Sequence, residues 1–481
     1  MSSVVEHVAS DALYVAQQKV YPREVTGRFR RLRTIAATSL LGIFYGMAWL
    51  QWQGHQVVLF DLPARKFYIF GLTFLPQDFF FLTWLLILAA LSLFFVTALA
   101  GRLWCGYACP QTVWTDAFVW LERITEGKRA QRMKLDKAPW SVNKAWRKTA
   151  KQILWISLAL YTGFTFVGYF TPIRLLLAEI IHVDTGPWET FWVLFYGAAT
   201  YGNAGYLREQ VCKYMCPYAR FQSAMFDKHT LIITYDADRG EPRGSRGRGL
   251  GYKAEGLGDC IDCTLCVQAC PTGIDIRKGL QYECIACAAC IDACDSVMDK
   301  MKYQRGLVRY STQAAVEGNA PHVLRPRTLI YGLILGALFV GFVYAITHRD
   351  LVQTDVLRDR NALYRELDDG RIENVYAVRV INKDDRPHDF RFSVEQLPNA
   401  QVESDPVLVH VAAATVASVA LRVSAAPLAN GGGHDIRIIA TASDAPQLRA
   451  VSKARFFSLA VDAEHTRGSD DFGDFHEQRR H

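Results

Sequence analysis

The chain has 481 residues, of which 51% are hydrophobic, and its formal net charge is +7. This length is too great for one ordinary domain, and the apolar fraction is high for a soluble protein. Because Lys and Arg are concentrated in alternate segments between apolar windows, we attribute the net charge to membrane topology and predict no nucleic-acid partner.

Five apolar windows are long enough to cross a lipid bilayer, which takes about 20 residues. They predict a polytopic α-helical membrane protein, with a four-span domain at 34–206 that contains a loop at 101–150, and a fifth helix at 328–346. The segment 1–33 is polar and has no apolar core typical of a cleavable signal peptide. The fourth window contains Glu189 and several glycines, so a buried or interfacial helix is the alternative there. The windows are Thr34–Trp52, Phe79–Ala100, Ile153–Phe170, Trp188–Tyr206 and Thr328–Ile346.

The distribution of Lys and Arg predicts the orientation of these spans. Six lie before the first window, two in 54–78, ten in 102–148, one in 171–187 and seventeen in 207–327. The positive-inside rule therefore places the N-terminus and the two rich segments in the cytoplasm and residues after about 347 in the periplasm of a bacterium. All twelve cysteines lie on the predicted cytoplasmic side, where thiols stay reduced, and the last 187 residues contain none. We predict a protein of the bacterial inner membrane.

Two motifs of the form Cys-x3-Cys-Pro follow the second and fourth windows. The first CxxxCP motif contains Cys105 and Cys109, and the second contains Cys212 and Cys216. If the helix continues, the two cysteines of a motif share one helix face. Alternatively the helix ends near the second cysteine and the proline begins the next helix. Either way, the sequence places two pairs of thiols at one predicted membrane depth.

Three interpretations of these four cysteines remain open. Thiolates select Cu(I), zinc or iron–sulfur iron, so the motifs could form a copper site with catalytic cysteines or a third metal centre with four thiolates. They could also be buried structural residues or a redox-active dithiol. Met215 would suit Cu(I) as a thioether ligand, although a lone Met is more often a packing residue. His55 and His182, on the predicted periplasmic side, are candidate early metal contacts, with ordinary loop residues as the alternative.

The cytoplasmic region 207–327 contains eight cysteines in two similar runs, within a ferredoxin-like domain at about 250–310. The runs are Cys260-x2-Cys263-x2-Cys266-x3-Cys270-Pro271 and Cys284-x2-Cys287-x2-Cys290-x3-Cys294. This spacing is typical of two 4Fe–4S clusters, in which the fourth cysteine of each run binds the other cluster. It therefore assigns Cys260, Cys263, Cys266 and Cys294 to one cluster, and Cys284, Cys287, Cys290 and Cys270 to the other. Zinc is the alternative, but zinc sites seldom repeat this spacing. The Gly- and Arg-rich stretch 239–258 suggests a flexible basic linker.

The exterior segment 347–465 has short strand-like runs between turn signals, which predict a small β-sandwich. The expected strands are Val375–Ile381, Phe390–Val394, Val416–Val423, Ile436–Thr441 and Val451–Leu459. No catalytic motif stands out there, so docking to a periplasmic partner is expected. The final residues 466–481 are polar and predict a disordered tail.

Several stretches resemble the cytochrome c oxidase accessory family CcoG/FixG/RdxA. They are Tyr21-Pro22-Arg23-Glu24, Gly101-Arg102-Leu103-Trp104-Cys105-Gly106-Tyr107, Cys109-Pro110-Gln111-Thr112-Val113-Trp114, and the region from Gln281 to Leu307. The resemblance extends over nearly the whole chain, and it implies that the exterior β-sandwich at 347–465 is immunoglobulin-like. It implies assembly of the cbb3-type haem–copper oxidase, in which the protein reduces Cu(II) to Cu(I) for the copper centre.

The predicted function is therefore that of a membrane-bound iron–sulfur redox protein that delivers electrons to copper, which would make it a cupric reductase. Expected cofactors are two 4Fe–4S clusters and copper. Expected partners are the lipid bilayer, copper ions, copper-delivery proteins of oxidase assembly, an unidentified electron donor and a second copy in a homodimer. The rival functions are a quinol dehydrogenase or electron-transfer subunit, and a non-enzymatic scaffold or redox sensor.

Overall fold

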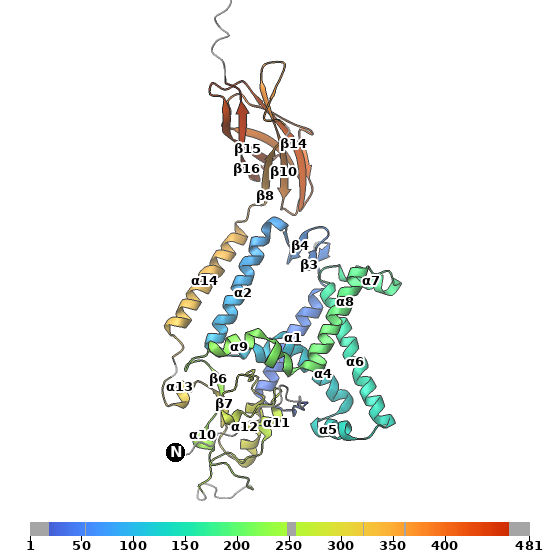
Figure 1. The fold of residues 1–481 in the computed structure, drawn as a ribbon, viewed down its shortest axis with the longest axis vertical. Coiled ribbons are helices and arrows are strands. Elements are labelled where there is room, and N and C mark those ends of the chain that lie inside the picture. Colours follow the sequence, from blue (N-terminus) through green and yellow to red (C-terminus); the bar gives the residue numbers. More distant parts are fainter. Residues whose placement is uncertain (1–18, 53, 248–255, 321, 360–361, 461–481) are drawn as a thin grey trace, which may run out of the picture. The chain divides into compact units, whose positions relative to one another are not determined.

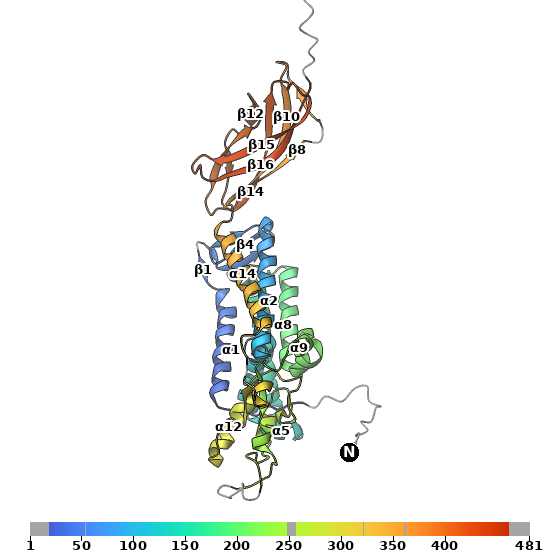
Figure 2. The ribbon, with the colours of Figure 1, turned by 90° about the vertical axis from the view of Figure 1, so that its left-hand side faces the viewer.

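A computed structural model describes residues 19–52, 54–247, 256–320, 322–359 and 362–460. It contains two compact units, Met1–Phe60 with Phe81–Phe342, and Asp61–Phe80 with Val343–His481, and each is described by itself (Figures 1 and 2). The predicted tail 466–481, the first 18 residues of the N-terminal segment and residues 248–255 of the expected linker lie outside the described residues.

Among the described residues, three helices are long and apolar enough to cross a membrane. They contain α2 (Phe79–Ala100), α6 (Val142–Val167) and α14 (Pro326–Thr347). α2 and α14 are antiparallel, since Phe81 contacts Phe342 and a Cβ on Gly332 would lie 3.5 Å from the Phe95 ring. Both are apolar on all sides, as expected for helices that face lipid. These helices indicate a membrane protein.

The prediction of five spans is supported for three of them. The first window forms α1 (Arg28–Met47), whose apolar part begins only after four arginines and ends at Met47, short of the about 20 residues that a bilayer requires. The fourth window forms α8 (Pro187–Thr200), which has 14 residues before the backbone changes to a π-helix, η2 (Tyr201–Leu207). Hydrophobicity alone did not predict these interruptions.

A helical layer around α6 positions the cysteines of the two CxxxCP motifs, which we term the membrane-edge cysteines (Cys105, Cys109, Cys212 and Cys216). α6 packs against α8 so closely that a Cβ on Gly163 would lie 2.3 Å from the Val193 carbonyl oxygen. On its other side α6 contacts α4 (Pro110–Glu126), where the Trp155 indole N–H donates to the Phe118 carbonyl at 3.1 Å. The other helices are α3 (Leu103–Tyr107), α5 (Arg129–Lys137), α7 (Ile173–His182), η3 (Val211–Met215) and α9 (Pro217–Ala224).

The eight-cysteine region forms a small domain around α11 (Leu265–Ala269), α12 (Ala289–Met301) and the antiparallel pair β6 (Ile232–Tyr235) and β7 (Val308–Ser311). Buried Asp292 of α12 accepts hydrogen bonds from the backbone N–H groups of Phe29 and Arg30, at 3.2 and 2.6 Å. A carboxylate there satisfies unpaired amides at the N-terminus of α1 and complements its dipole. The cysteine domain is thereby fixed to the first apolar helix.

The expected flexible linker is ordered where the structure describes it. Residues Ala237–Gly240 form a helical turn, α10, and Arg239 pairs with Asp259 at 2.5 Å. Arg239 also donates to the Arg305 carbonyl at 3.1 Å. These contacts hold the start of the stretch against the cysteine domain, because one arginine can donate several hydrogen bonds. Amino-acid composition does not show which partners an arginine will find in the fold.

The second unit contains the predicted immunoglobulin-like β-sandwich (Figures 1 and 2). One sheet has the order β12-β14-β10-β8, with β9 paired to β10, and the other has the order β13-β11-β15-β16. All five expected strands are present, as β10 (Ile372–Asn382), β11 (His388–Glu395), β14 (Thr415–Ala425), β15 (Gly432–Ala442) and β16 (Arg449–Ser458). Alternate inward residues such as Tyr376, Phe390 and Phe456 are fully buried. The remaining strands are β8 (Val352–Arg358), β9 (Arg365–Glu366), β12 (Gln401–Ser404) and β13 (Val409–Val411).

A histidine at the start of β11 gives this sandwich a predicted pH dependence. Buried His388 lies between Asp444 at 2.7 Å and Asp384 at 3.0 Å. Burial lowers the pKa of His388, but these two hydrogen bonds outweigh it and the pKa is raised. Protonated His388 therefore stabilises the folded sandwich fully below the unfolded-state pKa of about 6.5. This stabilisation is lost as the pH rises through the higher pKa that His388 has in the folded state.

We expect the sandwich of the full-length protein to unfold at a lower temperature at pH 8.5 than at pH 6, measured by pulse proteolysis of the detergent-solubilised protein. The variant His388→Gln should lose most of this difference. The control is His410→Gln, because His410 makes a similar pair with Asp389 but remains exposed. Equal pH dependence in wild type and His388→Gln would contradict the assignment.

Candidate functional site

The two cysteine runs repeat one backbone conformation. In the first run Asp262 and Thr264 have left-handed φ values of 51° and 57°, and in the second Ala286 and Ala288 have 51° and 58°. These positions are two and four residues after the first cysteine of each run. Left-handed non-glycine residues are uncommon and cluster at ligand-binding sites, where surrounding contacts maintain them. The internal repeat of the sequence is therefore a repeat of loop geometry.

The folded loops enclose two small cavities, and the cysteines divide between them. One cavity is lined by Cys260, Cys263, Cys266 and Cys294; we term it the distal cavity. The other is lined by Cys270, Cys284, Cys287 and Cys290, with Cys266 on the shared wall; we term it the proximal cavity. The fourth cysteine of each run thus faces the cavity of the other run.

The lining of both cavities fits a thiolate-bound iron–sulfur cluster. Around the sulfur atoms the walls are mainly aliphatic, including Ile233 and Ile276 in the proximal cavity and Val297 and Leu307 in the distal one. None of the twelve cysteines forms a disulfide. In the part of the chain that the structure describes, no three His, Cys, Asp or Glu side chains converge on a single-ion site. Cysteines arranged around a space, rather than around a point, suit a cluster better than one zinc ion.

Burial raises the pKa of three cavity thiols strongly. For Cys284 and Cys294 it raises the pKa to about 12, and for Cys266 to about 11. These three thiols are therefore protonated at neutral pH unless a metal binds, and cluster binding must displace their protons. Low dielectric around the sulfurs is also one of the factors that set a cluster's reduction potential.

Both CxxxCP motifs end one helix and begin another. Cys109 has an extended backbone and precedes Pro110, the first residue of α4, while Cys216 is likewise extended before Pro217 of α9. Of the two conformations left open by the sequence, the structure has the second. Cys212 lies in the π-helix η3, a rare conformation that is frequent at functional sites.

The fold brings the two motifs together although they are about a hundred residues apart in sequence. Burial, with negative charge on Cys109 and Cys212, outweighs Arg102 and raises the pKa of Cys105 to about 12. Burial likewise raises the pKa of Cys212 to about 11, with contributions from Cys109 and Cys216. The two motifs are therefore neighbours in the fold, although within the described residues no three of their thiols form a group that could hold a single metal ion. Burial also raises the pKa of Cys109, although backbone amides of Thr112 and Gln111 donate to it and oppose this shift.

Two buried polar residues beside these thiols were not predicted as site residues. Arg102 donates to the carbonyls of Tyr282, Cys284 and Ala219, which places a positive charge between the first motif and the proximal cavity. Gln222 is fully buried and accepts a hydrogen bond from the Cys105 thiol at 3.3 Å. The position of Arg102 close to the first CxxxCP motif indicated that it could be a site residue. Its hydrogen-bond partners could not be predicted, because they are more than a hundred residues away in the sequence.

The first motif also lies directly against the proximal cavity. A Cβ on Gly106 would be 2.7 Å from the Ile285 carbonyl oxygen and 2.9 Å from the Cys287 Cα. Glycine is required there because the obstacles are backbone atoms. Cys105 packs in the same apolar cluster as Ile285 and Cys287. The structure therefore packs the first CxxxCP motif directly against the cluster-binding loop.

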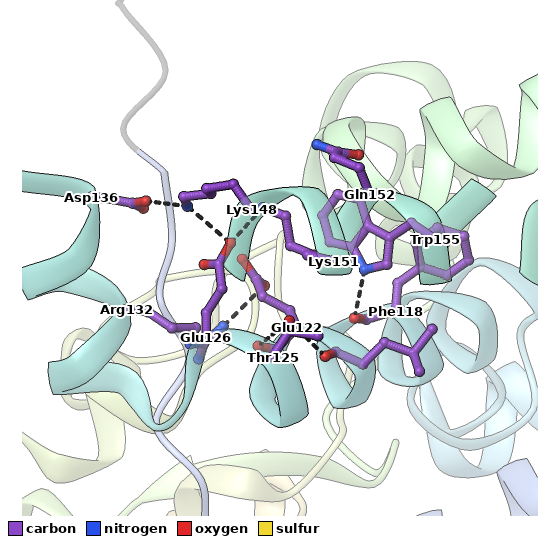
Figure 3. Close-up of polar contacts among 12 residues, drawn as sticks. Phe118, Glu122, Thr125, Glu126, Arg132, Asp136, Lys148, Lys151, Gln152 and Trp155 are labelled. Carbon is purple, nitrogen blue, oxygen red and sulfur yellow. Dashed lines mark hydrogen bonds and ion pairs between the residues drawn. The ribbon is translucent and has the colours of Figure 1, made fainter. Parts of the chain in front are cut away.

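A buried network of charges surrounds α4, where Glu122 and Glu126 pair with Arg132, Lys148 and Lys151 (Figure 3). Glu122 of α4 is fully buried and pairs with Arg132 at 3.0 Å and with Arg208 at 2.9 Å. Arg208 has a φ of 42° and separates η2 from the segment that carries Cys212. Burial alone would raise the pKa of Glu122, but the two arginines outweigh it and lower the pKa, so the carboxylate stays charged. One helix thus fixes both motifs, since α4 begins directly after Cys109.

Three other candidates are not part of this arrangement. Within the described residues, neither His55 nor His182 belongs to a cluster that could hold a metal ion. His55 contacts the neighbouring Gln56 carbonyl at 3.2 Å, and His182 lies in the last turn of α7. Met215 is 59% exposed, whereas the four thiols nearby are partly or largely buried.

Comparisons with known families match three parts of the chain. Residues 207–313 match a 4Fe–4S dicluster domain, and residues 81–128 match a 4Fe–4S binding domain. Residues 342–458 match the IG-like fold at the C-terminal of FixG. The match at 207–313 contains both cysteine runs together with Cys212 and Cys216. The match at 81–128 contains Cys105 and Cys109. The chain is therefore an iron–sulfur protein.

Three curated proteins align with most of the chain. Nitrogen fixation protein FixG of Rhizobium meliloti is 38% identical and covers 81% of each chain. Protein RdxB of Cereibacter sphaeroides is 41% identical over 80% of this chain and 83% of its own, and Protein RdxA is 37% identical over 80% and 84%. The crystal structure of a FixG-related protein from Vibrio parahaemolyticus is 26% identical, covers 23% of this chain and 97% of its own, and has a TM-score of 0.21. With its dicluster domain, C-terminal IG-like fold and full-length relatives, the chain belongs to the FixG/CcoG/RdxA family.

Proposed function

We propose that this protein reduces Cu(II) to Cu(I) at the CxxxCP cysteines, with electrons from two 4Fe–4S clusters, during maturation of the copper centre of a cbb3-type cytochrome c oxidase. One observation carries the proposal: both motifs converge beside the loop that lines the proximal cavity. Cys105, Cys109, Cys212 and Cys216 are the proposed catalytic residues.

The order of the sites suggests the direction of a relay. The distal and proximal cavities share Cys266, and the proximal loop contacts Cys105. When bound, the two clusters supply single electrons. The chain holds the three sites in contact, excludes water with aliphatic side chains and provides soft thiolate ligands that favour Cu(I). Arg102 offsets the negative charge of thiolates that lose their protons on binding copper.

Single-turnover reoxidation separates this function from its main rival. The purified protein is reduced with dithionite, freed of excess reductant, and mixed with Cu(II) or with a quinone while the iron–sulfur absorbance is followed. A cupric reductase should be reoxidised by Cu(II) with formation of Cu(I), and a quinol dehydrogenase should be reoxidised by quinone. Reoxidation by quinone alone would favour the electron-transfer subunit, and reoxidation by neither would favour a scaffold or sensor.

A third iron–sulfur centre is the second candidate for the four membrane-edge cysteines. The observation in its favour is that the 4Fe–4S binding-domain match at 81–128 contains the first CxxxCP motif. Four converging thiols also match the ligand number of such a cluster. In that case the motifs would extend the electron relay and copper would react elsewhere.

We propose that the N-terminus, the 101–150 loop and 207–327 lie in the cytoplasm and the sandwich at 347–465 in the periplasm, with the chain in the bacterial inner membrane. This arrangement needs five crossings, so the windows that contain α1 and α8 must cross the membrane in addition to α2, α6 and α14. As partners we propose copper-delivery proteins, an electron donor and a second copy of the chain in a homodimer. A reporter that is active only in the cytoplasm should work when fused near Lys137 and fail near Ala425. An active fusion near Ala425 would require an even number of spans.

A further inference from the structure

A basic cavity lies beside the second CxxxCP motif, where the N-terminal segment passes α4 and α5. Its empty volume, including the open mouth, is about 1020 Å³. Eight lysine or arginine side chains line it, against three acidic ones. Such an excess within a concave surface focuses a positive potential that attracts anions.

The neighbours of this cavity are the redox sites. Cys212 contributes directly to its lining, and Thr272 and Ile285 line both this cavity and the proximal cluster cavity. The Thr272 hydroxyl is 3.3 Å from the Cys270 sulfur. A small molecule bound here would therefore contact one catalytic thiol of the proposed copper site and the wall of a cluster site at once.

The positive charge of the cavity is only partly neutralised within the chain. Arg30 and Arg33 share a single carboxylate, that of Asp116, at 3.0 and 2.8 Å. Arg33 is buried, and its Nε has no hydrogen-bond partner among the residues that the structure describes. Arg129 donates to two neutral oxygens, the Tyr21 carbonyl and the Gln268 amide. An anionic ligand would supply the missing countercharge.

Within the described lining no side chain is aromatic. Flavins and quinones are usually held in sites with aromatic and apolar walls, so this cavity suits them poorly. The cations of the lining suit an anionic chelate, and the Cys212 thiol suits the metal ion that the chelate carries. The bare Cu(II) aqua ion, in contrast, would be repelled by the lining.

We propose that the substrate of the copper reaction is an anionic, carboxylate-bearing chelate of Cu(II), which binds in this basic cavity with its metal toward Cys212. This inference rests on the proposed cupric reductase function and adds its substrate class. One electron passes from a reduced 4Fe–4S centre to Cu(II) and gives Cu(I). The chelator is then released as Cu(I) passes to thiolates, whose displaced protons go to solvent.

The test compares Cu(II) complexes of opposite charge with the full-length protein in detergent. Reoxidation of the dithionite-reduced clusters should be faster with anionic Cu(II)–nitrilotriacetate than with cationic Cu(II)–bis(ethylenediamine), and salt should reduce the difference. The double variant Arg23→Glu/Lys128→Glu, at the exposed rim, should slow only the anionic complex, by about tenfold. Equilibrium dialysis of Cu(II)–nitrilotriacetate with the oxidised protein should show the same loss of affinity.

The matched control is Lys134→Glu, a charge reversal at an exposed position of α5 outside the cavity lining. Its rate and affinity should equal those of wild type. Equal rates for both complexes, or an equal effect of the control variant, would overturn the anionic-substrate proposal. If neither complex reoxidises the clusters, the cupric reductase function fails instead, while the dialysis result still decides whether the cavity binds the chelate.

Discussion

Replacing both cysteines of the first CxxxCP motif by serine should abolish single-turnover reduction of Cu(II), with about eight irons still bound per chain. The iron is expected to remain because neither cysteine lines the distal or proximal cavity. Copper reduction should be lost because serine hydroxyls do not replace soft thiolates as Cu(I) ligands. Iron analysis, bound copper and the reoxidation assay measure the three quantities on one preparation. The same result is expected for Cys212→Ser/Cys216→Ser.

The matched control is Met215→Leu. This residue lies inside the second motif, but its side chain is 59% exposed, so the substitution should leave copper reduction and iron content unchanged. If the serine variants lose iron, the four cysteines form a third iron–sulfur centre. If they change neither iron, copper nor reoxidation, the motifs are structural and the copper mechanism is wrong.

In cells, the serine variants should lose haem–copper oxidase activity most clearly when copper is scarce. Added copper should restore it, because uncatalysed reduction of abundant copper can partly replace the protein. Oxidase activity that stays low at high copper would separate the cysteines from copper supply.

Local sequence patterns predicted the elements whose geometry is set by nearby residues. The spacing of each cysteine run determines a loop of fixed length, and both loops fold alike, with left-handed residues at equivalent positions. Alternation of apolar residues in 390–394 likewise predicted β11, since a half-buried sheet requires a period of two, and the strand-like run 375–381 predicted β10. The division of cysteines between the cavities also follows from spacing. The three residues between the third and fourth cysteines of a run allow the fourth cysteine to reach the cavity of the other run.

Contacts between distant segments could not be predicted in this way. The convergence of the two CxxxCP motifs depends on Glu122 and Arg208, which lie far apart in the chain and meet only in the fold. Asp292 was visible only as a residue between two cluster cysteines, although it caps α1. The change from α8 to a π-helix at Tyr201 is also invisible to a hydropathy window, because it alters hydrogen bonding and not polarity.

The cross-ligand substitutions should separate the two clusters. Cys294→Ala is expected to damage the cluster of the distal cavity, although Cys294 belongs to the second run, because its side chain lines the cavity of the first run. Cys270→Ala should damage the proximal cluster for the converse reason. Each variant should retain about four irons per chain in the intact cluster, measured by iron analysis and by electron paramagnetic resonance of the reduced protein.

The positions of the two cavities then predict different consequences for copper. The proximal cavity shares its wall with the apolar cluster around Cys105, so Cys270→Ala should block electron delivery to Cu(II) almost completely. Cys294→Ala should still allow one electron per chain to reach Cu(II), since the proximal cluster remains loaded by dithionite. The number of Cu(I) formed per chain in a single turnover distinguishes the two variants. Equal yields from both would mean that copper does not receive its electron through the proximal site, and damage to the cluster of the same run would overturn the cross-ligand assignment.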